Sequence, residues 1–398
     1  MRLVVLALLL SATFAPAVLA DAKWNEDGWL ATIGQEHLRE GDEFGCYGVP
    51  NLSWQADPGA VAHECREYIE ARIDASKWGV NPISTFTPSN LTAAQHTNIV
   101  TQGFVIHGDN TGQSATAWHT STDVPEYEYD WLDLGRRGGS LEKGIADVEE
   151  LSDELDLGGL VNMYWIGRVD DATVRHESEV IEMLSQRNDV WYTTWGEAYS
   201  YWTVERCHEF DHELEDKVLS FEHSATEACS AAAPNAWNVP ITWIVEIPNA
   251  TVISSNLPVM NLDESNTMEG WRQEGDILYI SVLIGHPVNF TLSENVDYDI
   301  LGRSQFFNNK SAALTIAGHS TTDLFQWSKR FDNYDDLRFT WLLSPQSLDA
   351  DLAWLPYAGV GVLLASVSGI WLLLKKDALA HSRAEALMPT SIGGQDDE

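Results

Sequence analysis

The chain has 398 residues, of which 60 are acidic and 23 are basic, so its formal net charge is −37 at pH 7. A surface this acidic repels phosphate groups, which excludes nucleic acid as a partner. Apolar residues make up 44% of the sequence and include 17 tryptophans, enough to build a hydrophobic core, so a chain kept disordered by its charge is excluded as well.

The first 20 residues have the pattern of a secretory signal peptide. Arg2 provides a positive start, an apolar stretch covers residues 3–10, and small residues lead up to Ala20. This pattern predicts cleavage after Ala20 and export of the rest of the chain. The alternative is an uncleaved N-terminal anchor, for which the apolar stretch is short.

In residues 21–232, short apolar runs alternate with stretches of helical periodicity. The helical periodicity covers residues 60–75 and 141–155, and the strand-like runs are residues 83–86, 104–107, 160–166 and 190–194. Strands that alternate with helices are typical of parallel β/α units. We therefore predict an α/β domain over residues 21–232.

The character of the sequence changes in residues 233–348. The β-rich runs there are residues 237–247, 251–254, 277–284, 288–292, 312–316 and 337–343, and turn signals such as Glu274-Gly275-Asp276 separate them. Many short β-rich runs with turns between them predict an antiparallel β-sandwich. This second domain is expected to stand between the first domain and the membrane.

Residues 352–374 carry no charge. As a helix, these 23 residues are about 34 Å long, which is enough to cross the roughly 30 Å hydrocarbon core of a bilayer. Aspartates precede the segment and Lys375 and Lys376 follow it, so the positive-inside rule places residues 375–398 in the cytoplasm. The sequence thus predicts a single-pass protein of the cell membrane with its large domains outside, and the alternative is a buried core helix.

Four cysteines lie in the exported part of the chain, namely Cys46, Cys65, Cys207 and Cys229. An even number of cysteines outside the membrane predicts two disulfides. Pairing Cys46 with Cys65 and Cys207 with Cys229 closes the shortest loops, and two other connectivities stay open.

Several short motifs follow one another in a recognisable order. They are Glu43 to Gly48 (EFGCYG), a helix that contains Cys65, STFTP at 84–88, Gly103-Phe104, Tyr129-Asp130-Trp131 and the stretch 189–199. In this order the motifs resemble the polysaccharide deacetylase family over residues 35–205. The resemblance implies an irregular deacetylase-like β/α barrel, followed here by the β-sandwich and the transmembrane helix, and a carbohydrate as the ligand class.

The chain departs from the family at the metal site. In that family one Asp and two His hold a divalent metal that activates water, and an Asp acts as base. Tyr47 and Asn51 stand at the two histidine positions, Thr87 replaces the arginine of the groove, and no paired aspartates precede residue 39. These departures predict a barrel that has lost the metal site.

A second set of residues offers a rearranged metal site. His107, Asp109 and His119 follow a predicted strand, and two imidazoles with one carboxylate suit zinc and leave an open position for water. Asp130 matches the family's Asp-Trp motif, and Glu197 follows another predicted strand, so both are candidate catalytic carboxylates. The alternative for all five residues is structural, as solvated loop residues or helix caps.

Aromatic residues near predicted strand ends form a third set. Tyr47, Trp131, Trp165 and Trp195 are candidate ligand-binding residues, because flat rings stack on the faces of sugars. Packing in the core or between domains is the alternative for each of them.

Two hypotheses for function follow from these residues. The first is a cell-surface protein whose deacetylase-like domain binds a glycan or a surface partner, with no cofactor. The second is an active carbohydrate deacetylase or hydrolase with zinc in the rearranged site. A purely structural envelope protein is a third alternative. In every case the membrane is a partner of the C-terminal helix.

Overall fold

The computed structural model describes residues 28–50, 52–81, 85–88, 91–108, 131–134, 147–166, 177–227, 231, 234–319, 337–345 and 355–386. The chain divides into two compact units. One unit joins Met1–Lys23 to Ser347–Glu398, and the other is Trp24–Gln346.

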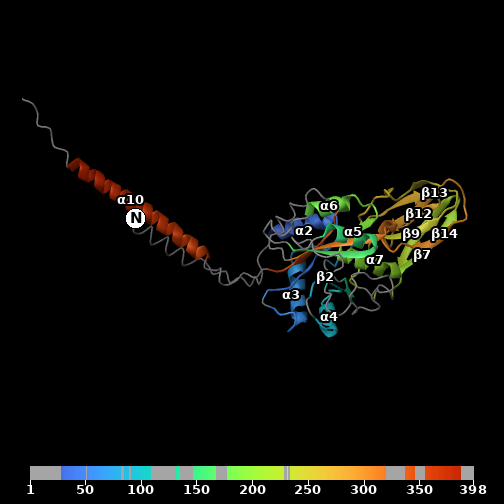
Figure 1. Cartoon of the computed structure of the whole chain (residues 1–398), viewed down its shortest axis with the longest axis horizontal. Helices are drawn as coiled ribbons and strands as arrows, with labels where there is room; N and C mark the ends of the chain where they lie inside the picture. The colour runs from blue at the N-terminus through green and yellow to red at the C-terminus, as the bar shows by residue number, and fades with distance from the viewer. Residues whose placement is uncertain are drawn as a thin grey trace, which may run out of the picture. The chain divides into compact units, whose positions relative to one another are not determined.

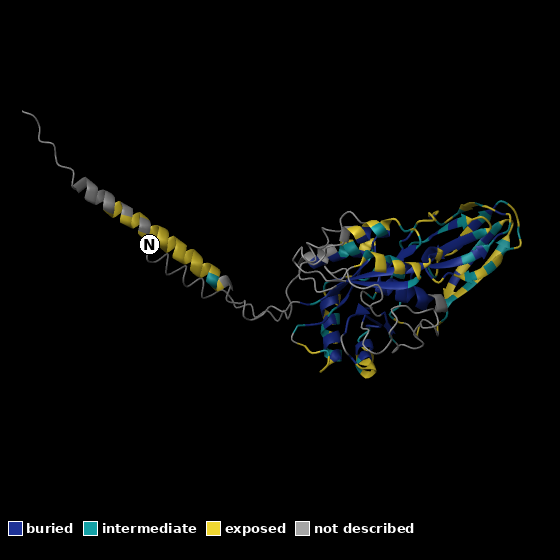
Figure 2. Ribbon diagram, viewed as in Figure 1, coloured by how far each residue is buried: buried dark blue, intermediate teal, exposed yellow. Residues whose placement is uncertain are grey.

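The described part of the first unit is a single helix, α10 (Leu355–Ala386), of 32 residues. Its segment Tyr357–Lys376 has a mean hydropathy of 1.9 over 20 residues, long and apolar enough to cross a membrane. None of this segment is buried, and Figure 2 shows most of the described part of the helix as exposed. The predicted membrane span therefore has a matching helix, and its insertion in a membrane stays a prediction.

The larger unit is of the mixed α/β kind, built around a curled, half-barrel sheet of eight parallel strands (Figure 1). The strands are β1 (Glu43–Cys46), β2 (Thr85–Phe86), β3 (Ile106–His107), β4 (Leu132–Asp133), β5 (Gly159–Ile166), β6 (Val190–Tyr192), β15 (Ala312–His319) and β16 (Phe339–Leu343). Their order is β4-β3-β2-β1-β16-β15-β5. β6 pairs with the first half of β15 and β16 pairs with its second half, so these two strands share one side of β15.

Six helices accompany this sheet. They are α2 (Gly28–Glu40), α3 (Pro58–Glu70), α4 (Ala93–Val100), α5 (Val148–Asp156), α6 (Glu177–Ser185) and α7 (Trp195–Cys207). Local sequence determines where some of them begin. Helix α3 starts at Pro58 because the side chain of Asp57 accepts a hydrogen bond from the backbone N–H of Ala60 and proline suits the first helical position.

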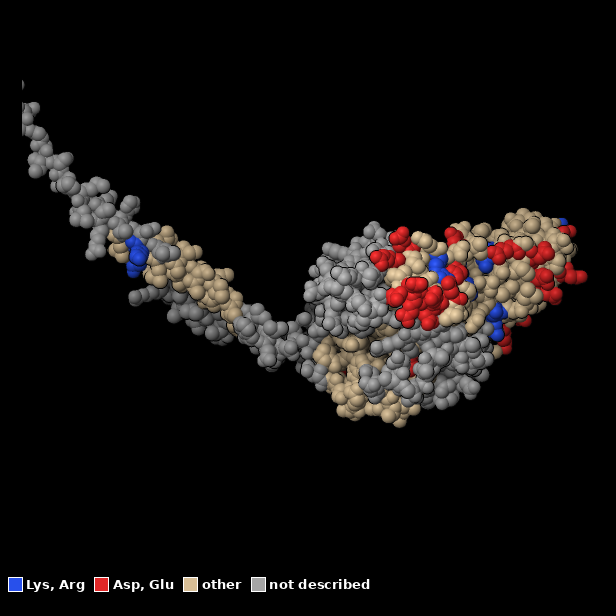
Figure 3. Space-filling model, in the orientation of Figure 1, with Lys and Arg blue, Asp and Glu red and all other residues tan. Residues whose placement is uncertain are grey.

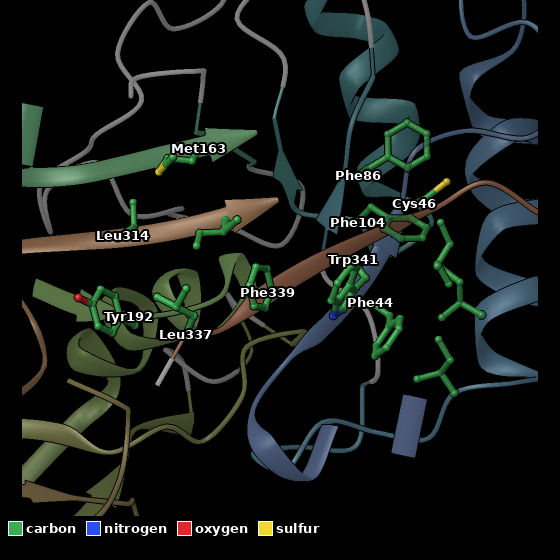
Figure 4. Packing of buried hydrophobic residues seen from close by; sticks show 14 of the residues in the cluster. Phe44, Cys46, Phe86, Phe104, Met163, Tyr192, Leu314, Leu337, Phe339 and Trp341 are labelled. Atoms are coloured by element: carbon green, nitrogen blue, oxygen red, sulfur yellow. The ribbon is translucent and has the colours of Figure 1, made fainter. Parts of the chain in front are cut away.

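Two hydrophobic clusters cover the two faces of the sheet. On one face, side chains of α2, α3, α5 and α6 pack against strand residues such as Phe44, Leu314 and Trp341 (Figure 4). On the other face, which we call the α7 face, Ala313 and Leu342 pack with residues of α7 and of the antiparallel region. Alternate residues of each strand thus serve different clusters, as the period of two in a strand requires.

Two antiparallel sheets of four strands form the rest of the unit, with orders β10-β13-β8-β7 and β11-β12-β9-β14. The strands are β7 (His208–Glu215), β8 (Val218–Ala225), β9 (Ile241–Glu246), β10 (Val252–Ser255), β11 (Gly270–Glu274), β12 (Ile277–Val282), β13 (Val288–Leu292) and β14 (Asp299–Arg303). Residues of both sheets share one core that includes Phe221, Ile280 and Phe290. The sandwich predicted for this region is thus present, and the predicted turn at Gly275 joins β11 to β12.

Two of the predicted sandwich strands lie elsewhere. Residues 312–316 and 337–343 belong to β15 and β16, which pair in parallel with β5, β6 and β1 in the centre of the other sheet. Conversely, the hairpin β7–β8 precedes residue 232 but belongs to the sandwich. The predicted boundary after residue 232 therefore does not separate the two kinds of sheet. Along the chain, the antiparallel strands lie between α7 and β15, so they form an insertion in the α/β part.

One predicted disulfide is confirmed. Cys46 at the end of β1 is bonded to Cys65 in α3, with 6.0 Å between their Cα atoms, and both side chains are fully buried. Cys229 lies outside the described residues, so the pairing of Cys207 with Cys229 stays a prediction.

Acidic side chains dominate the charge on the face of the protein seen in Figure 3, and they gather over α5 and α6. The sequence of α5, VEELSDELD, explains part of this, because its apolar residues Val148, Leu151 and Leu155 pack against the core and most of its other residues are acidic. Asp147 caps the helix, and Glu149 and Glu150 in the first turn complement the helix dipole. The acidic surface thus has a structural explanation.

The sandwich contains a pair of histidines, partly buried His208 on β7 and buried His223 on β8, whose Nδ1 atoms are 3.1 Å apart. Burial among aromatic rings lowers the pKa of His208 from 6.5 to about 3 and that of His223 to about 4. Both imidazoles are therefore neutral in the folded protein at neutral pH.

We predict that acid destabilises the protein through this pair. The unfolded chain binds protons on these histidines below about pH 6.5, while the folded chain does so only near pH 4 and 3. Each histidine then removes up to about 1.4 kcal/mol of unfolding free energy per pH unit as the pH falls from 6.5 to 4. Urea unfolding between pH 4 and 7 measures this slope, and His223→Phe is expected to reduce it. An equal slope in the variant would contradict the prediction.

Candidate functional site

His107, a predicted metal ligand, ends β3 and is fully buried. Its Nε2 lies 3.0 Å from the carbonyl oxygen of Phe104, and its Nδ1 lies 2.6 Å from Nδ1 of His96 on α4. A carbonyl only accepts, so Nε2 of the neutral ring carries the proton and Nδ1 accepts from His96. Burial, and then the neighbouring His96, hold the pKa of His107 well below its ordinary value. In this arrangement His107 has no lone pair left for a metal.

The other predicted members of the rearranged metal site, Asp109, His119 and Asp130, lie outside the described residues, as does Asn51. Within the described ranges no group of three or more His, Cys, Asp or Glu side chains converges as metal ligands would. The convergence of the predicted set therefore stays a prediction.

Trp131 lies against the pair formed by His96 and His107. Its ring stacks on His96 with centroids 4.4 Å apart and planes 16° apart, and its centroid is 5.2 Å from that of His107. The indole is partly buried. One face of this predicted ligand-binding ring is thus occupied by the protein itself.

Trp195, the first residue of α7, is fully buried on the α7 face of the parallel sheet. Its Nε1 donates to Oδ1 of Asn162 at 2.9 Å, and its backbone N–H donates to the hydroxyl of Thr340 at 3.1 Å. The ring leaves room only for glycine at position 108, where a Cβ would lie 2.2 Å from it. Trp195 fills the interior and presents no ring face to solvent.

Glu197, a predicted catalytic residue, is buried at the start of α7. Its Oε1 accepts from Nε1 of Trp78 at 2.6 Å, and its Oε2 accepts from the backbone N–H of Thr194 at 3.2 Å. The hydroxyl of Thr194 accepts from the backbone N–H of Glu197 at 3.2 Å, which completes a capping box. One carboxylate oxygen thus holds the helix start and the other holds Trp78, and these bonds explain the burial of Glu197 without catalysis.

A second buried carboxylate is that of Glu43, a residue of the EFGCYG motif for which the sequence predicted no role. Its Oε2 accepts from the backbone N–H of Gly196 at 2.6 Å, so it too lies at the N-terminus of α7. Helix N-termini favour negative charge, which explains a charged side chain inside the core. The signal available in the sequence was an acidic residue at the start of a short strand-like run.

The remaining predicted ligand-binding residues lie on β5 and after β1. Tyr47 is partly buried, and its ring meets that of Trp54 edge to face at a centroid distance of 6.0 Å. The backbone of Trp165 is part of β5, and its side chain lies outside the described part of the structure. Whether Tyr47 and Trp165 lie side by side in a groove therefore stays a prediction.

A cleft of about 660 Å³ lies away from these residues, beside the end of α6, Tyr192, Leu337 and the turn formed by residues 261–266. The polar residues along it include Arg187, Asn188, Asp263 and Asn266. Residues 186–188 lead into β6 and Leu337 leads into β16, so the cleft lies at the amino edge of the parallel sheet. None of its residues was a candidate from sequence, because the turn and the end of α6 lie far apart in the chain.

Comparison with known protein families, with curated proteins and with solved structures finds no match to this chain.

Proposed function

We propose that this chain is a single-pass membrane protein of the cell surface, whose divergent polysaccharide deacetylase-like part binds a glycan or a surface partner and has not kept the family's metal site. The observation that carries the proposal is the side chain at the first histidine position. Tyr47 follows β1 and packs against Trp54, and a phenol there supplies no imidazole to a metal.

The order of the strands supports the deacetylase-like part of the proposal. Starting from β15, the sheet runs β15-β16-β1-β2-β3-β4. Neighbouring strands are consecutive in the chain, except that β1, the first strand, lies beside β16, the last. Under this proposal the family's first strand, which carries paired aspartates, corresponds to β15 or β16 and not to a segment upstream of β1. The described residues at the ends of these strands, Gly318, His319 and Leu343, include no aspartate.

The anchor is part of the same proposal. Helix α10 carries an apolar segment of bilayer length that ends at Lys375 and Lys376. The positive-inside rule then places the C-terminal residues in the cytoplasm and the α/β and sandwich parts outside. The alternative function, a zinc-dependent carbohydrate deacetylase, needs a free nitrogen on His107, which in the geometry described above is engaged by His96 and Phe104.

The full-length chain in lipid nanodiscs tests the proposal. We expect that metal analysis finds less than stoichiometric zinc, that acetylated oligosaccharides release no acetate, and that any binding on a glycan array survives treatment with a chelator. Stoichiometric zinc together with acetate release would contradict the proposal and favour the zinc-dependent carbohydrate deacetylase.

A further inference from the structure

The sequence carries a second motif with a defined chemistry, the sequon N-x-S/T, which is the acceptor of N-glycosylation in exported proteins. Five sequons occur, and they begin at Asn51, Asn90, Asn249, Asn289 and Asn309. Asn51 and Asn90 lie outside the described residues. A motif this short also arises by chance, so the geometry around the other three decides which of them can carry a glycan.

The sequon at Asn289 faces solvent on strand β13. Asn289 is exposed and Thr291 is partly buried, whereas Phe290 between them is fully buried in the core of the sandwich. Because successive side chains of a strand point to opposite faces, the amide of Asn289 and the hydroxyl of Thr291 lie on the same outer face. Among the described residues, neither of these two side chains forms a hydrogen bond.

The strands beside Asn289 leave room for a sugar. Ser220 on β8 is its cross-strand partner, and Asn256, just after β10, accepts a hydrogen bond from its backbone N–H at 2.9 Å. Both neighbouring side chains are short, polar and uncharged. A first sugar residue on Asn289 therefore meets hydrogen-bonding groups and neither a bulky ring nor a charge.

The sequon at Asn249 lies in the turn between β9 and β10. Asn249 and Thr251 are exposed, and Ala250 between them is buried. The backbone N–H of Asn249 donates to Oδ1 of Asp276 at 2.9 Å, so the turn is held through its main chain. Within the described ranges the side chains of Asn249 and Thr251 form no hydrogen bond, which leaves the amide and the hydroxyl of this sequon accessible.

The sequon at Asn309 differs, because the fold uses both of its functional groups. Nδ2 of Asn309 lies 3.5 Å from the hydroxyl of Tyr279. The hydroxyl of Ser311 donates to Oδ2 of Asp189 at 3.1 Å. These contacts set Asn309 apart from the other two acceptors.

We infer that Asn249 and Asn289 carry N-linked oligosaccharides. In the transfer, Nδ2 of the asparagine forms a bond to C1 of an oligosaccharide while the bond from C1 to the phosphate of a lipid-linked donor breaks. The lipid phosphate leaves, and the amide gives up one proton to a base of the membrane-bound transferase. The inference rests on the proposed function, since the parts of a protein outside the cytoplasm are the ones exported past this transferase. It concerns attached glycans and is independent of any glycan that the deacetylase-like part binds.

The two acceptors flank an edge strand that has no charge. β10 lies at one edge of its sheet, pairs with the strand of Asn289 and follows the turn of Asn249. Ile253 in this strand is 67% exposed. The opposite edge, β7, carries four acidic residues, and charges of this kind protect an edge strand from pairing with other chains. Glycans on Asn249 and Asn289 give the uncharged edge a comparable protection.

The test uses full-length protein purified from the membranes of the cells that make it naturally. Trypsin separates the three acceptors, because Arg272 and Arg303 lie between them, and mass spectrometry then measures each peptide. We expect an attached oligosaccharide on the peptides that contain Asn249 and Asn289, and an unmodified Asn309. Modification of Asn309 in place of the other two would contradict the inference.

Variants of Thr291 show whether the sequon itself is read. Thr291→Ala is expected to abolish the modification of Asn289 although the acceptor amide is still present, and Thr291→Ser is expected to keep it. Asn98→Gln is the matched control, since Asn98 is exposed on α4 and begins no sequon. It should leave both glycans in place. A glycan on Asn289 that survives in Thr291→Ala would mean that another reaction attaches it, and the inference would be wrong.

The protection of β10 has its own measurement. The double variant Asn249→Gln, Asn289→Gln is expected to aggregate faster than the wild type and faster than Asn98→Gln, and equal rates would contradict this role of the glycans.

Protease added to intact cells separates the inference from the proposed function. If the wild type carries no glycan on Asn249 or Asn289 while the protease digests the larger unit, the inference is wrong and the location outside the cell stands. If the protease spares the larger unit and the glycans are missing, the inference and the proposed location are both wrong.

Discussion

Replacing Trp195 by alanine is expected to lower the unfolding free energy by about 4 kcal/mol, the largest effect of any single substitution considered for this protein. The indole is fully buried on the α7 face, and its removal leaves a cavity in a close-packed interior. The hydrogen bond from Nε1 to Asn162 is lost as well. Urea unfolding of the full-length variant, followed by circular dichroism, measures the change.

The control for this substitution is Trp195→Phe, which keeps most of the apolar volume and loses only the hydrogen bond. It should cost about 1–2 kcal/mol, much less than alanine. A Trp195→Ala protein with wild-type stability but weaker sugar binding would instead show that this ring stacks on a ligand, as its sequence position suggested. Measuring both the unfolding free energy and sugar binding thus separates a packing role of Trp195 from a binding role.

Removing the disulfide between Cys46 and Cys65 is expected to lower the unfolding free energy by about 3 kcal/mol. The bond closes a loop with a sequence separation of 19, and crosslinks of this length restrict the unfolded chain by roughly that amount. It also joins the central strand β1 to the helix that covers it. The double variant Cys46→Ala, Cys65→Ala is compared with the wild type by urea unfolding.

Reductant provides the control for this second prediction. It should lower the stability of the wild type by about as much as the double substitution does, and it should have less effect on the double variant. If the variant is as stable as the oxidised wild type, the bond does not constrain the unfolded chain and the prediction is wrong.

The local features of the fold were accessible from sequence because they depend on neighbouring residues. The helix over residues 60–75 corresponds to α3, and the β-rich run 288–292 corresponds to β13. The short loop between Cys46 and Cys65 made their pairing the simplest one. In each case the pattern, cap or spacing lies within about twenty residues.

The position of the last two strands of the parallel sheet was not accessible in this way. β-rich composition identifies a strand but not its neighbours, and β15 and β16 pair with strands more than a hundred residues away in the chain. Both consist mainly of buried residues, as expected for strands covered on both sides in a parallel sheet. A continuous apolar run was the only hint that they did not belong to a sandwich, whose strands alternate.

The candidate residues show the same division. From sequence, Trp195 and Glu197 were equally good candidates for a groove or for a core and a helix cap. The structure shows both side chains buried, with hydrogen bonds to Asn162, Trp78 and Thr194 at their polar atoms. No local sequence pattern could predict the cleft, because its walls come from α6 and from a turn of the inserted sandwich, which are far apart in the chain.

The sequence by itself determined the acidic charge, the apolar segment that becomes α10, the presence of both parallel and antiparallel strand regions, and one disulfide. These follow from composition and short-range periodicity, which the chain carries whatever its tertiary contacts. Only the tertiary structure decided that the sandwich is an insertion, that Trp195 is fully buried, and that the carboxylate of Glu197 accepts hydrogen bonds from Trp78 and Thr194. These depend on which distant segments meet, and burial and hydrogen bonding at those meetings are properties of the folded chain alone.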